Sequence, residues 1–238
     1  MDAPAKVVSK LKKGLVVSCQ AAASSPLSRA SIIAATALVA EQQGAVGVRV
    51  DGGRNIRAVK QVVSVPIIGI EKRHLDGYPV FITPTYASAQ RVCRAGAEIV
   101  ALDATDRSRP KGQSLGEILE RVRREFSVAV MADVATLDEG LRAADLGIEL
   151  IATTLHGYTE NTRDSQTPAF RLLRNLVQKA GVPVVLEGRV RTPDHLRRAF
   201  DLGAYAVVVG TAITGMEWLV RSFAQAVPRH AAERQSAQ

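Results

Sequence analysis

The sequence predicts a single α/β domain, a (β/α)8 (TIM) barrel with a phosphate site at the loops after its seventh and eighth strands. Eight apolar, β-branched runs alternate with segments of helical periodicity along the chain. The runs are apolar on both faces, as parallel strands buried between two layers are. The length of 238 residues suits one such barrel, which needs about 250. An open doubly wound sheet is the alternative, but no G-x-G-x-x-G motif follows the first run.

The first half of the chain supplies four strand–helix units. A short amphipathic helix is expected at residues 7–13 of the N-terminal segment 1–13, where it would close the bottom of the barrel. Apolar runs at residues 15–19, 45–51, 65–72 and 98–105 predict the first four strands. Helices are expected at residues 28–43, from residue 55 and at 87–94, with Gly44 and Gly96 as stop signals. The VFIT run at residues 80–83 is interpreted as a small extra strand in the third loop.

The second half repeats the pattern. Strands are predicted at residues 128–134, 149–157, 182–188 and 204–210, and helices at 115–126, 136–146, 169–180, 192–203 and 217–226. The last helix carries Trp218, Leu219 and Phe223, which would either pack against a second copy in a homodimer or cap the barrel. The polar residues 229–238 are expected to form a disordered tail.

Composition limits the classes of function. Hydrophobic residues make up 47% of the chain, enough for a sizeable core, whereas aromatic residues make up 4%, which disfavours a platform for stacking bases. The net charge of +8 would permit nucleic-acid binding. Basic residues such as Arg121, Arg123 and Arg124 are spread over helices, however, where solvated faces are expected. We therefore expect no nucleic-acid partner.

The cysteine count points to a reducing compartment. Cys19 and Cys93 have neither disulfide nor metal-ligand spacing, and no His, Cys and carboxylate cluster predicts a metal site. Cys19 is interpreted as an inert buried thiol. No apolar run reaches the roughly 18 residues of a membrane span, and the N-terminus lacks the apolar core of a signal peptide. We expect a cytoplasmic protein without a membrane partner.

Polar residues end nearly every predicted strand. In a closed barrel, the C-terminal ends of the strands converge on one mouth. These ends are Gln20, Arg49, Lys72, Asp103, Asp133, His156, Glu187 and Gly210. Each one has a structural alternative: Asp103 and Asp133 could orient neighbours or cap loops, and Arg49 could form an internal ion pair. Taken together, they predict a polar binding site.

Lys72 and Glu187 are the predicted catalytic pair. A lysine in a partly dry mouth can have a lowered pKa, so that it acts as a general base or forms a Schiff base. Glu187 ends an apolar strand, where a carboxylate is costly to bury without a use or a partner. The third and seventh strands face each other across a barrel, which suits removal of a proton alpha to a carbonyl.

Two glycine-bearing loops predict where a phosphate would bind. Gly188 and Gly210 follow the seventh and eighth strands, and glycine lets backbone N–H groups approach an anion closely. His156 lies in the TTLHGYT segment. It is interpreted either as a substrate contact or as a loop histidine bonded to the backbone.

Nine segments match the pattern of one known family: VSCQ (17–20), GAVGVRVDG (44–52), PIIGIEKR (66–73), FITPT (81–85), AEIVALDAT (97–105), MADVATLDEG (131–140), TTLHGYT (153–159), VLEGRVRTP (185–193) and GAYAVVVGTAIT (203–214). By these segments the chain resembles the N-acylglucosamine-6-phosphate (N-acetylmannosamine-6-phosphate) 2-epimerases of sialic-acid catabolism. The segments occur in order and cover nearly the whole chain. The combination of ALDAT, TTLHGYT and GAYAVVVG is specific.

The resemblance implies a (β/α)8 barrel, no cofactor, and reversible inversion at C2 of an N-acetylhexosamine 6-phosphate. Lys72 matches the family's catalytic lysine and Glu187 its catalytic glutamate. Gln20, Arg49 and Asp133 match residues that contact the sugar. The loops at Gly188 and at Gly210 and Thr211 match the phosphate site.

One position departs from the family pattern. Many members carry an arginine directly after AIT, within reach of the phosphate, and Gly215 stands there in this chain. Arg189, Arg191 or backbone N–H groups could take its place.

Three other functions remain open at this stage. A phosphosugar isomerase or lyase that uses Lys72 as a Schiff base would leave a covalent adduct on borohydride trapping. A non-catalytic phosphosugar-binding protein would bind without turnover. A nucleic-acid-binding protein would show salt-dependent binding to generic DNA.

Overall fold

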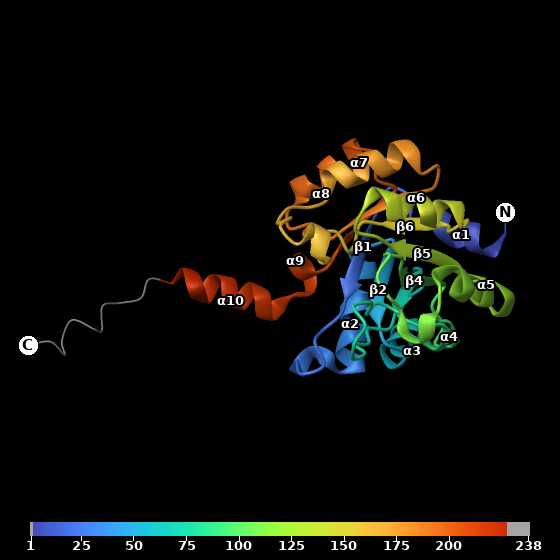
Figure 1. The fold of residues 1–238 in the computed structure, drawn as a ribbon. Coiled ribbons are helices and arrows are strands. Elements are labelled where there is room, and N and C mark those ends of the chain that lie inside the picture. Colours follow the sequence, from blue (N-terminus) through green and yellow to red (C-terminus); the bar gives the residue numbers. More distant parts are fainter. Residues whose placement is uncertain (1, 228–238) are drawn as a thin grey trace, which may run out of the picture.

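The computed structural model describes residues 2–227 and forms a closed, all-parallel eight-stranded barrel, which confirms the predicted fold (Figure 1). The strands follow one another around the barrel in chain order. They are β1 (Gly14–Cys19), β2 (Gly47–Asp51), β3 (Ile67–Ile70), β4 (Ile99–Asp103), β5 (Ala129–Asp133), β6 (Leu150–Ala152), β7 (Val184–Glu187) and β8 (Ala206–Val209). β8 closes the barrel by pairing with β1, with Gly14 opposite Ala206 and Val17 opposite Val209.

Helices surround the barrel in alternation with the strands (Figure 1). They are α1 (Ala3–Ser9), α2 (Ala30–Gln42), α3 (Gly53–Lys60), α4 (Tyr86–Arg94), α5 (Leu115–Glu125), α6 (Leu137–Asp145), α7 (Phe170–Lys179), α8 (Pro193–Asp201), α9 (Thr211–Thr214) and α10 (Met216–Ala226). Short 3-10 turns lie at Pro26–Ser28, Pro110–Gly112 and Glu160–Thr162. Among the described residues, no helix is long and apolar enough to cross a membrane.

The core has two parts because strand side chains alternate between the two faces of the barrel wall. Alternate strand residues such as Ile68, Ile99, Met131 and Leu150 fill the barrel interior. Their neighbours pack outward against the helices in a larger cluster, to which Val100 and Leu173 belong. All six of these side chains are fully buried. The mouth at the C-terminal ends of the strands is therefore the open part of the interior.

The predicted N-terminal helix closes the bottom of the barrel, although it lies at Ala3–Ser9 rather than at residues 7–13. Val8 and Leu11 are buried with the interior residues, and α1 contacts β4 and β5. Gly47 of β2 makes room for this segment, because a Cβ there would come within 2.7 Å of Leu11 Cδ2. This N-terminal segment therefore closes the end of the barrel opposite the mouth.

Helix starts follow the expected capping chemistry. Thr136 and Glu139 form a reciprocal capping box at α6: the Thr136 side chain accepts from the Glu139 amide, and the Glu139 carboxylate accepts from the Thr136 amide. Ser114 and Glu117 repeat this arrangement at α5. These caps satisfy amides that lack a partner inside the helix.

Three further sequence predictions differ from the structure. Residues 80–83 form no strand, but Ile82 makes one antiparallel bridge to Lys72. β6 ends at Ala152, five residues earlier than predicted. α10 does not cap its own barrel: none of its residues is buried, and it extends away from the body (Figure 1). The predicted disordered tail at 229–238 lies outside the described residues.

Candidate active site

A cavity of about 430 Å³ lies at the C-terminal mouth of the barrel. It is lined by Ser18, Gln20, Arg49, Ile70, Lys72, Phe81, Ile82, Thr154, Leu155, Tyr158, Glu187, Gly188, Arg189, Val190, Arg191, Val208, Gly210, Thr211, Thr214 and Gly215. Segments far apart in sequence meet here because parallel strands present their C-terminal ends at the same rim. The mouth is where the predicted strand-end residues were expected to converge.

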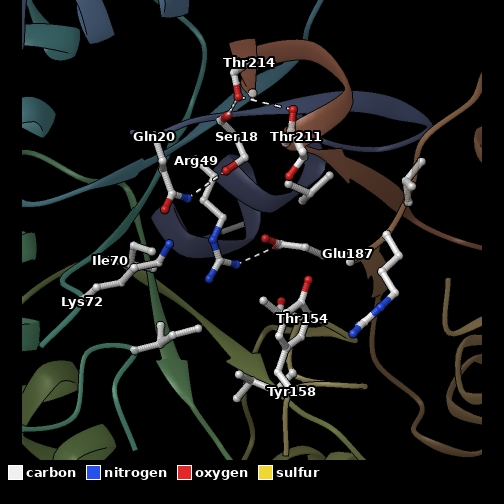
Figure 2. A pocket seen from close by; sticks show the side chains of 18 of the residues that line it. Ser18, Gln20, Arg49, Ile70, Lys72, Thr154, Tyr158, Glu187, Thr211 and Thr214 are labelled. Atoms are coloured by element: carbon white, nitrogen blue, oxygen red, sulfur yellow. Dashed lines mark hydrogen bonds and ion pairs between the residues drawn. The ribbon is translucent and has the colours of Figure 1, made fainter. Parts of the chain in front are cut away.

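Arg49, on the cavity wall, binds two carboxylates: that of Glu187, which also lines the cavity (Figure 2), and that of Asp133 behind it. Its Nη2 donates to Asp133 Oδ2 at 2.6 Å, and its Nη1 donates to Asp133 Oδ1 at 3.0 Å and to Glu187 Oε2 at 2.7 Å. The side chain is only 1% exposed. Although burial opposes the charge, the carboxylates of Asp133 and Glu187 raise the pKa of Arg49 above its ordinary value. One cation therefore serves two anions.

Other side chains on the cavity wall are hydrogen-bonded as well. Thr154 Oγ1 donates to Asp133 Oδ1 at 2.6 Å. The Gln20 amide donates to Ser18 Oγ at 2.8 Å (Figure 2). Two buried atoms, Gln20 Oε1 and Arg49 Nε, have no hydrogen-bond partner within residues 2–227. Unpaired buried polar atoms are rare, and both of these belong to residues that line the cavity.

Lys72 lies across the mouth from Glu187, with the Arg49 guanidinium between them (Figure 2). Its backbone amide donates to Asp51 Oδ1 at 2.9 Å, which fixes the chain just after β3. The side chain is accessible from the mouth, but most of its surroundings are protein. This burial lowers the pKa of Lys72 below its ordinary value, the charge of Asp51 opposes the shift, and Arg49 adds to it. The amine is therefore easier to deprotonate than a surface lysine.

Glu187 shows the opposite perturbation. Burial, together with the nearby charge of Asp133, raises the pKa of Glu187 to about 7, although Arg49 and Lys72 pull it down. Its backbone is fixed to β6, since the Glu187 amide donates to Thr153 Oγ1 at 3.1 Å and its carbonyl accepts from the same hydroxyl at 2.9 Å. The result is a rigidly held carboxyl group that can carry a proton near neutral pH.

The predicted phosphate loops form one side of the same cavity. Gly188 has a φ of 106°, a conformation that favours glycine. Gly210 lies close to β1: a Cβ added to it would lie 3.3 Å from the Cβ of Ser18. Thr214 Oγ1 donates to the Ser18 carbonyl at 2.8 Å and so ties α9 to β1. Residues 188–190 and residues 210–211 therefore line the cavity side by side with the end of β1.

Most of the predicted site residues meet in this cavity, but three strand-end residues do not line it. Asp133 lies fully buried behind Arg49. Asp103 is bonded to Thr105 and Arg107 of its own loop. His156 lies outside the cavity with its Nδ1 at 2.9 Å from the Ala135 carbonyl, which agrees with the backbone-bonded interpretation.

Sequence reasoning missed several residues on the cavity wall, notably Ser18, Thr154 and Tyr158. Thr154 could have been found, because it lies two residues after β6 once that strand is ended at Ala152, at the rim of the mouth. Ser18 lies inside a strand, where only the inward alternation marks it. Tyr158 is in a loop and carries no such signal.

The arrangement suits the movement of a proton at a carbon atom. A lysine with a lowered pKa and a carboxyl with a raised pKa lie on opposite walls of one cavity, as expected of an acid–base pair. Within the described residues, no group of three or more His, Cys, Asp or Glu side chains has the geometry of a metal site.

Comparison with known proteins agrees with this geometry. Residues 33–229 match the family NanE, described as "Putative N-acetylmannosamine-6-phosphate epimerase". Relatives in Caldanaerobacter subterraneus subsp. tengcongensis and Synechococcus elongatus are 44% and 46% identical to this chain. Both are named "Putative N-acetylmannosamine-6-phosphate 2-epimerase", and the matches cover 91% and 92% of this chain and 92% and 95% of the relatives.

A solved structure extends the match to three dimensions. The N-acetylmannosamine-6-phosphate 2-epimerase from Clostridium perfringens superimposes with a TM-score of 0.89 at 38% identity, and covers 92% of this chain and 95% of its own. A thiamine phosphate pyrophosphorylase from Pyrococcus furiosus, at 17% identity and a TM-score of 0.59, shares the fold alone. By its sequence, its barrel and its cavity, the chain belongs to the NanE family of N-acetylmannosamine-6-phosphate epimerases.

Proposed function

We propose that this protein interconverts N-acetylmannosamine 6-phosphate and N-acetylglucosamine 6-phosphate by removing and returning the proton at C2, in the breakdown of sialic acid. The observation that carries the proposal is the placement of Lys72 and Glu187 on opposite walls of the cavity, with oppositely shifted pKa values. The family membership and the name of the Clostridium perfringens relative support the substrate.

The reaction requires the sugar in its open, aldehyde form. Glu187 assists ring opening by moving a proton at the ring oxygen or at O1. Lys72, as the neutral amine, then removes the C2 proton, which the C1 carbonyl makes acidic. The electron pair moves onto O1 to give an enolate, and N–H and O–H donors on the cavity wall stabilise it. Return of a proton to the other face of C2, from Lys72 or from Glu187, gives the epimer.

The remaining predicted residues hold the substrate. Gln20 lines the cavity, where its side-chain amide can hydrogen-bond to a sugar hydroxyl. Arg49 and Asp133 keep the wall of the cavity charged and rigid, with Asp133 acting from behind the arginine. We place the phosphate against the backbone at Gly188, Arg189, Gly210 and Thr211, where the loops after β7 and β8 border the cavity.

The test is proton NMR of N-acetylmannosamine 6-phosphate with the enzyme in D2O. We expect the gluco epimer to appear with deuterium at C2. Lys72→Ala should abolish turnover and largely spare binding. Lys72→Arg is the matched control, because it keeps a positive charge on a group that does not deprotonate in proteins. If Lys72→Ala kept a tenth of wild-type turnover, the role given to Lys72 would be wrong. If borohydride trapping left a covalent adduct on Lys72, the mechanism would be Schiff-base chemistry rather than proton transfer.

We propose a homodimer formed through α10. Its residues Met216, Val220 and Phe223 are 58%, 62% and 77% exposed, a large apolar face for a helix outside its own barrel. A second copy of the chain is the partner, and no nucleic acid is involved. Sedimentation analysis of Phe223→Glu against the wild type tests this. A wild-type monomer at micromolar concentration, or an unchanged mass in the variant, would refute the α10 interface.

We also propose that the enzyme is cytoplasmic. Both cysteines, Cys19 and Cys93, are free and buried, and burial raises the pKa of each thiol to about 12. Such thiols persist in a reducing compartment and are poor nucleophiles. Fractionation of cells that express the protein, with an antibody against it, would check the compartment.

A further inference from the structure

Four cationic side chains line the cavity: Arg49, Lys72, Arg189 and Arg191. Arg49 is committed to two carboxylates by three hydrogen bonds of 2.6–3.0 Å. Lys72 lies on the β3 side, across the mouth from the loops after β7 and β8 (Figure 2). Neither of these two cations is placed to neutralise a phosphate held between those loops.

Arg189 is committed as well, although it lies in the loop after β7. Its Nη1 donates to the His156 carbonyl and its Nη2 to the Gly157 carbonyl, both at 2.9 Å. Its guanidinium also stacks 4.3 Å from the centre of the Tyr158 ring. A Cβ on Gly157 would come within 2.3 Å of this guanidinium, so the group lies flat against the loop after β6. The Arg189 side chain thus fastens two loops together, and only its backbone is left for a ligand.

Arg191 is different. Within residues 2–227 its guanidinium makes no hydrogen bond and no ion pair; only its backbone amide is bonded, to His195. It contacts the ring of Trp218 in α10, with 5.1 Å from Cζ to the ring centre. The start of α10 is itself anchored at the rim, because Glu217 accepts a hydrogen bond from Ser25 in the loop after β1. An arginine that is exposed, unpaired and stacked therefore stands at the phosphate side of the mouth.

We propose that Arg191 is the cation that binds the phosphate of the substrate, and that Trp218 positions it. A guanidinium can bind two phosphate oxygens at once, and stacking on an aromatic ring fixes its plane while leaving its N–H groups free. The proposal rests on the phosphosugar chemistry proposed above. It makes the last helix part of the binding site, because α10 carries the ring that orients the arginine.

The test separates the phosphate from the rest of the sugar. Arg191→Gln should raise KM for N-acetylmannosamine 6-phosphate by about tenfold or more, since a hydrogen bond to a charged group is lost, and kcat should change little. With unphosphorylated N-acetylmannosamine, kcat/KM should be the same in both enzymes. Arg124→Gln is the matched control: it removes the same charge from an exposed residue at the C-terminal end of α5. Arg191→Lys should recover part of the loss.

The role of Trp218 needs its own pair of variants. Trp218→Ala should raise KM for the phosphosugar several-fold, and Trp218→Phe, which keeps a ring under the guanidinium, should stay near the wild type. Both should be measured at the same protein concentration. Equal KM values for Trp218→Ala and the wild type would refute the positioning role.

Binding of inorganic phosphate, followed by calorimetry, distinguishes failure of this inference from failure of the proposed function. A wild type that binds phosphate in an Arg191-dependent way but does not epimerise would refute the function and support the inference. Turnover with an unchanged KM in Arg191→Gln would refute the inference and leave the function. A wild type that binds neither phosphate nor the phosphosugar would refute both.

Discussion

Replacing Asp133 with Asn would test whether the charge of Asp133 raises the pKa of Glu187, with which it shares Arg49. Both Asp133 and Glu187 lie within 3.0 Å of the same nitrogen, Arg49 Nη1. Their oxygens are therefore about 6 Å apart at most, where an effective dielectric constant of about 20 gives a repulsion of about 3 kcal/mol. Asp133→Asn removes that repulsion and leaves Arg49 to Glu187 alone. Both changes favour the ionised carboxylate, so the pKa of Glu187 should fall by up to about 2 units.

The same substitution should also lower stability. Asp133 accepts hydrogen bonds from Arg49 through both oxygens and from Thr154. An asparagine offers one acceptor, and its NH2 group would face the guanidinium donor. Removing one partner of a buried ion pair costs about 3–5 kcal/mol of the free energy of unfolding. Asp145→Asn, at an exposed position at the end of α6, is the control and should be nearly neutral.

The assay is kcat/KM as a function of pH, with urea unfolding of the same samples. The active enzyme carries one proton on the Lys72–Glu187 pair, so activity rises as pH passes the lower pKa of the pair and falls beyond the higher one. In Asp133→Asn the ascending limb should move to lower pH. A limb that stays in place or moves upward, or a loss of stability below about 1 kcal/mol, would refute the electrostatic reasoning.

Three further predictions concern single residues. Glu187→Gln should remove the ascending limb near pH 7 altogether, because that limb reports the raised pKa of Glu187; a limb that persists in the variant would assign it to another group. Gly215→Ala should lower the free energy of unfolding by about 1–3 kcal/mol, because the new Cβ would lie 2.6 Å from the Thr211 carbonyl oxygen. This cost outweighs the stabilisation of about 0.4–1 kcal/mol that comes from a less flexible unfolded chain. An increase in the urea midpoint would contradict the clash. Thr136→Ala should cost about 1 kcal/mol by removing half of the capping box with Glu139, and thermal unfolding that matches the wild type would show the cap to be dispensable.

Much of the site could be predicted because, in a closed barrel, every residue at the C-terminal end of a strand lies at the same mouth. Lys72 and Glu187 end apolar runs, and the fold brings both to one mouth. Arg49 was expected at the mouth for the same reason, with an internal ion pair as its alternative role. The structure shows the ion pair, on the wall of the cavity.

The errors arose where strand length or a side-chain direction decides the outcome. His156 was placed at a strand end because the predicted strand, residues 149–157, runs five residues past Ala152, where β6 stops. The His156 ring instead bonds the Ala135 carbonyl. Arg189 and Arg191 are equivalent in sequence, two residues apart in one loop. Arg189 has a φ of 57°, in the left-handed region, and its guanidinium binds the loop after β6. Such a conformation depends on tertiary contacts that no local pattern encodes.

The pairing of β8 with β1 has a consequence for synthesis of the chain. The barrel closes only when Ala206–Val209 reaches Gly14–Cys19. The Tyr205 hydroxyl then also donates to the Val8 carbonyl, across 197 residues of sequence. At about 5–20 residues per second, a ribosome needs roughly 10–40 s to span that interval. During this time the β1 edge of the nascent chain has no partner and can pair with other chains. Chaperones that bind nascent chains should therefore raise the yield of this protein more than its small size suggests.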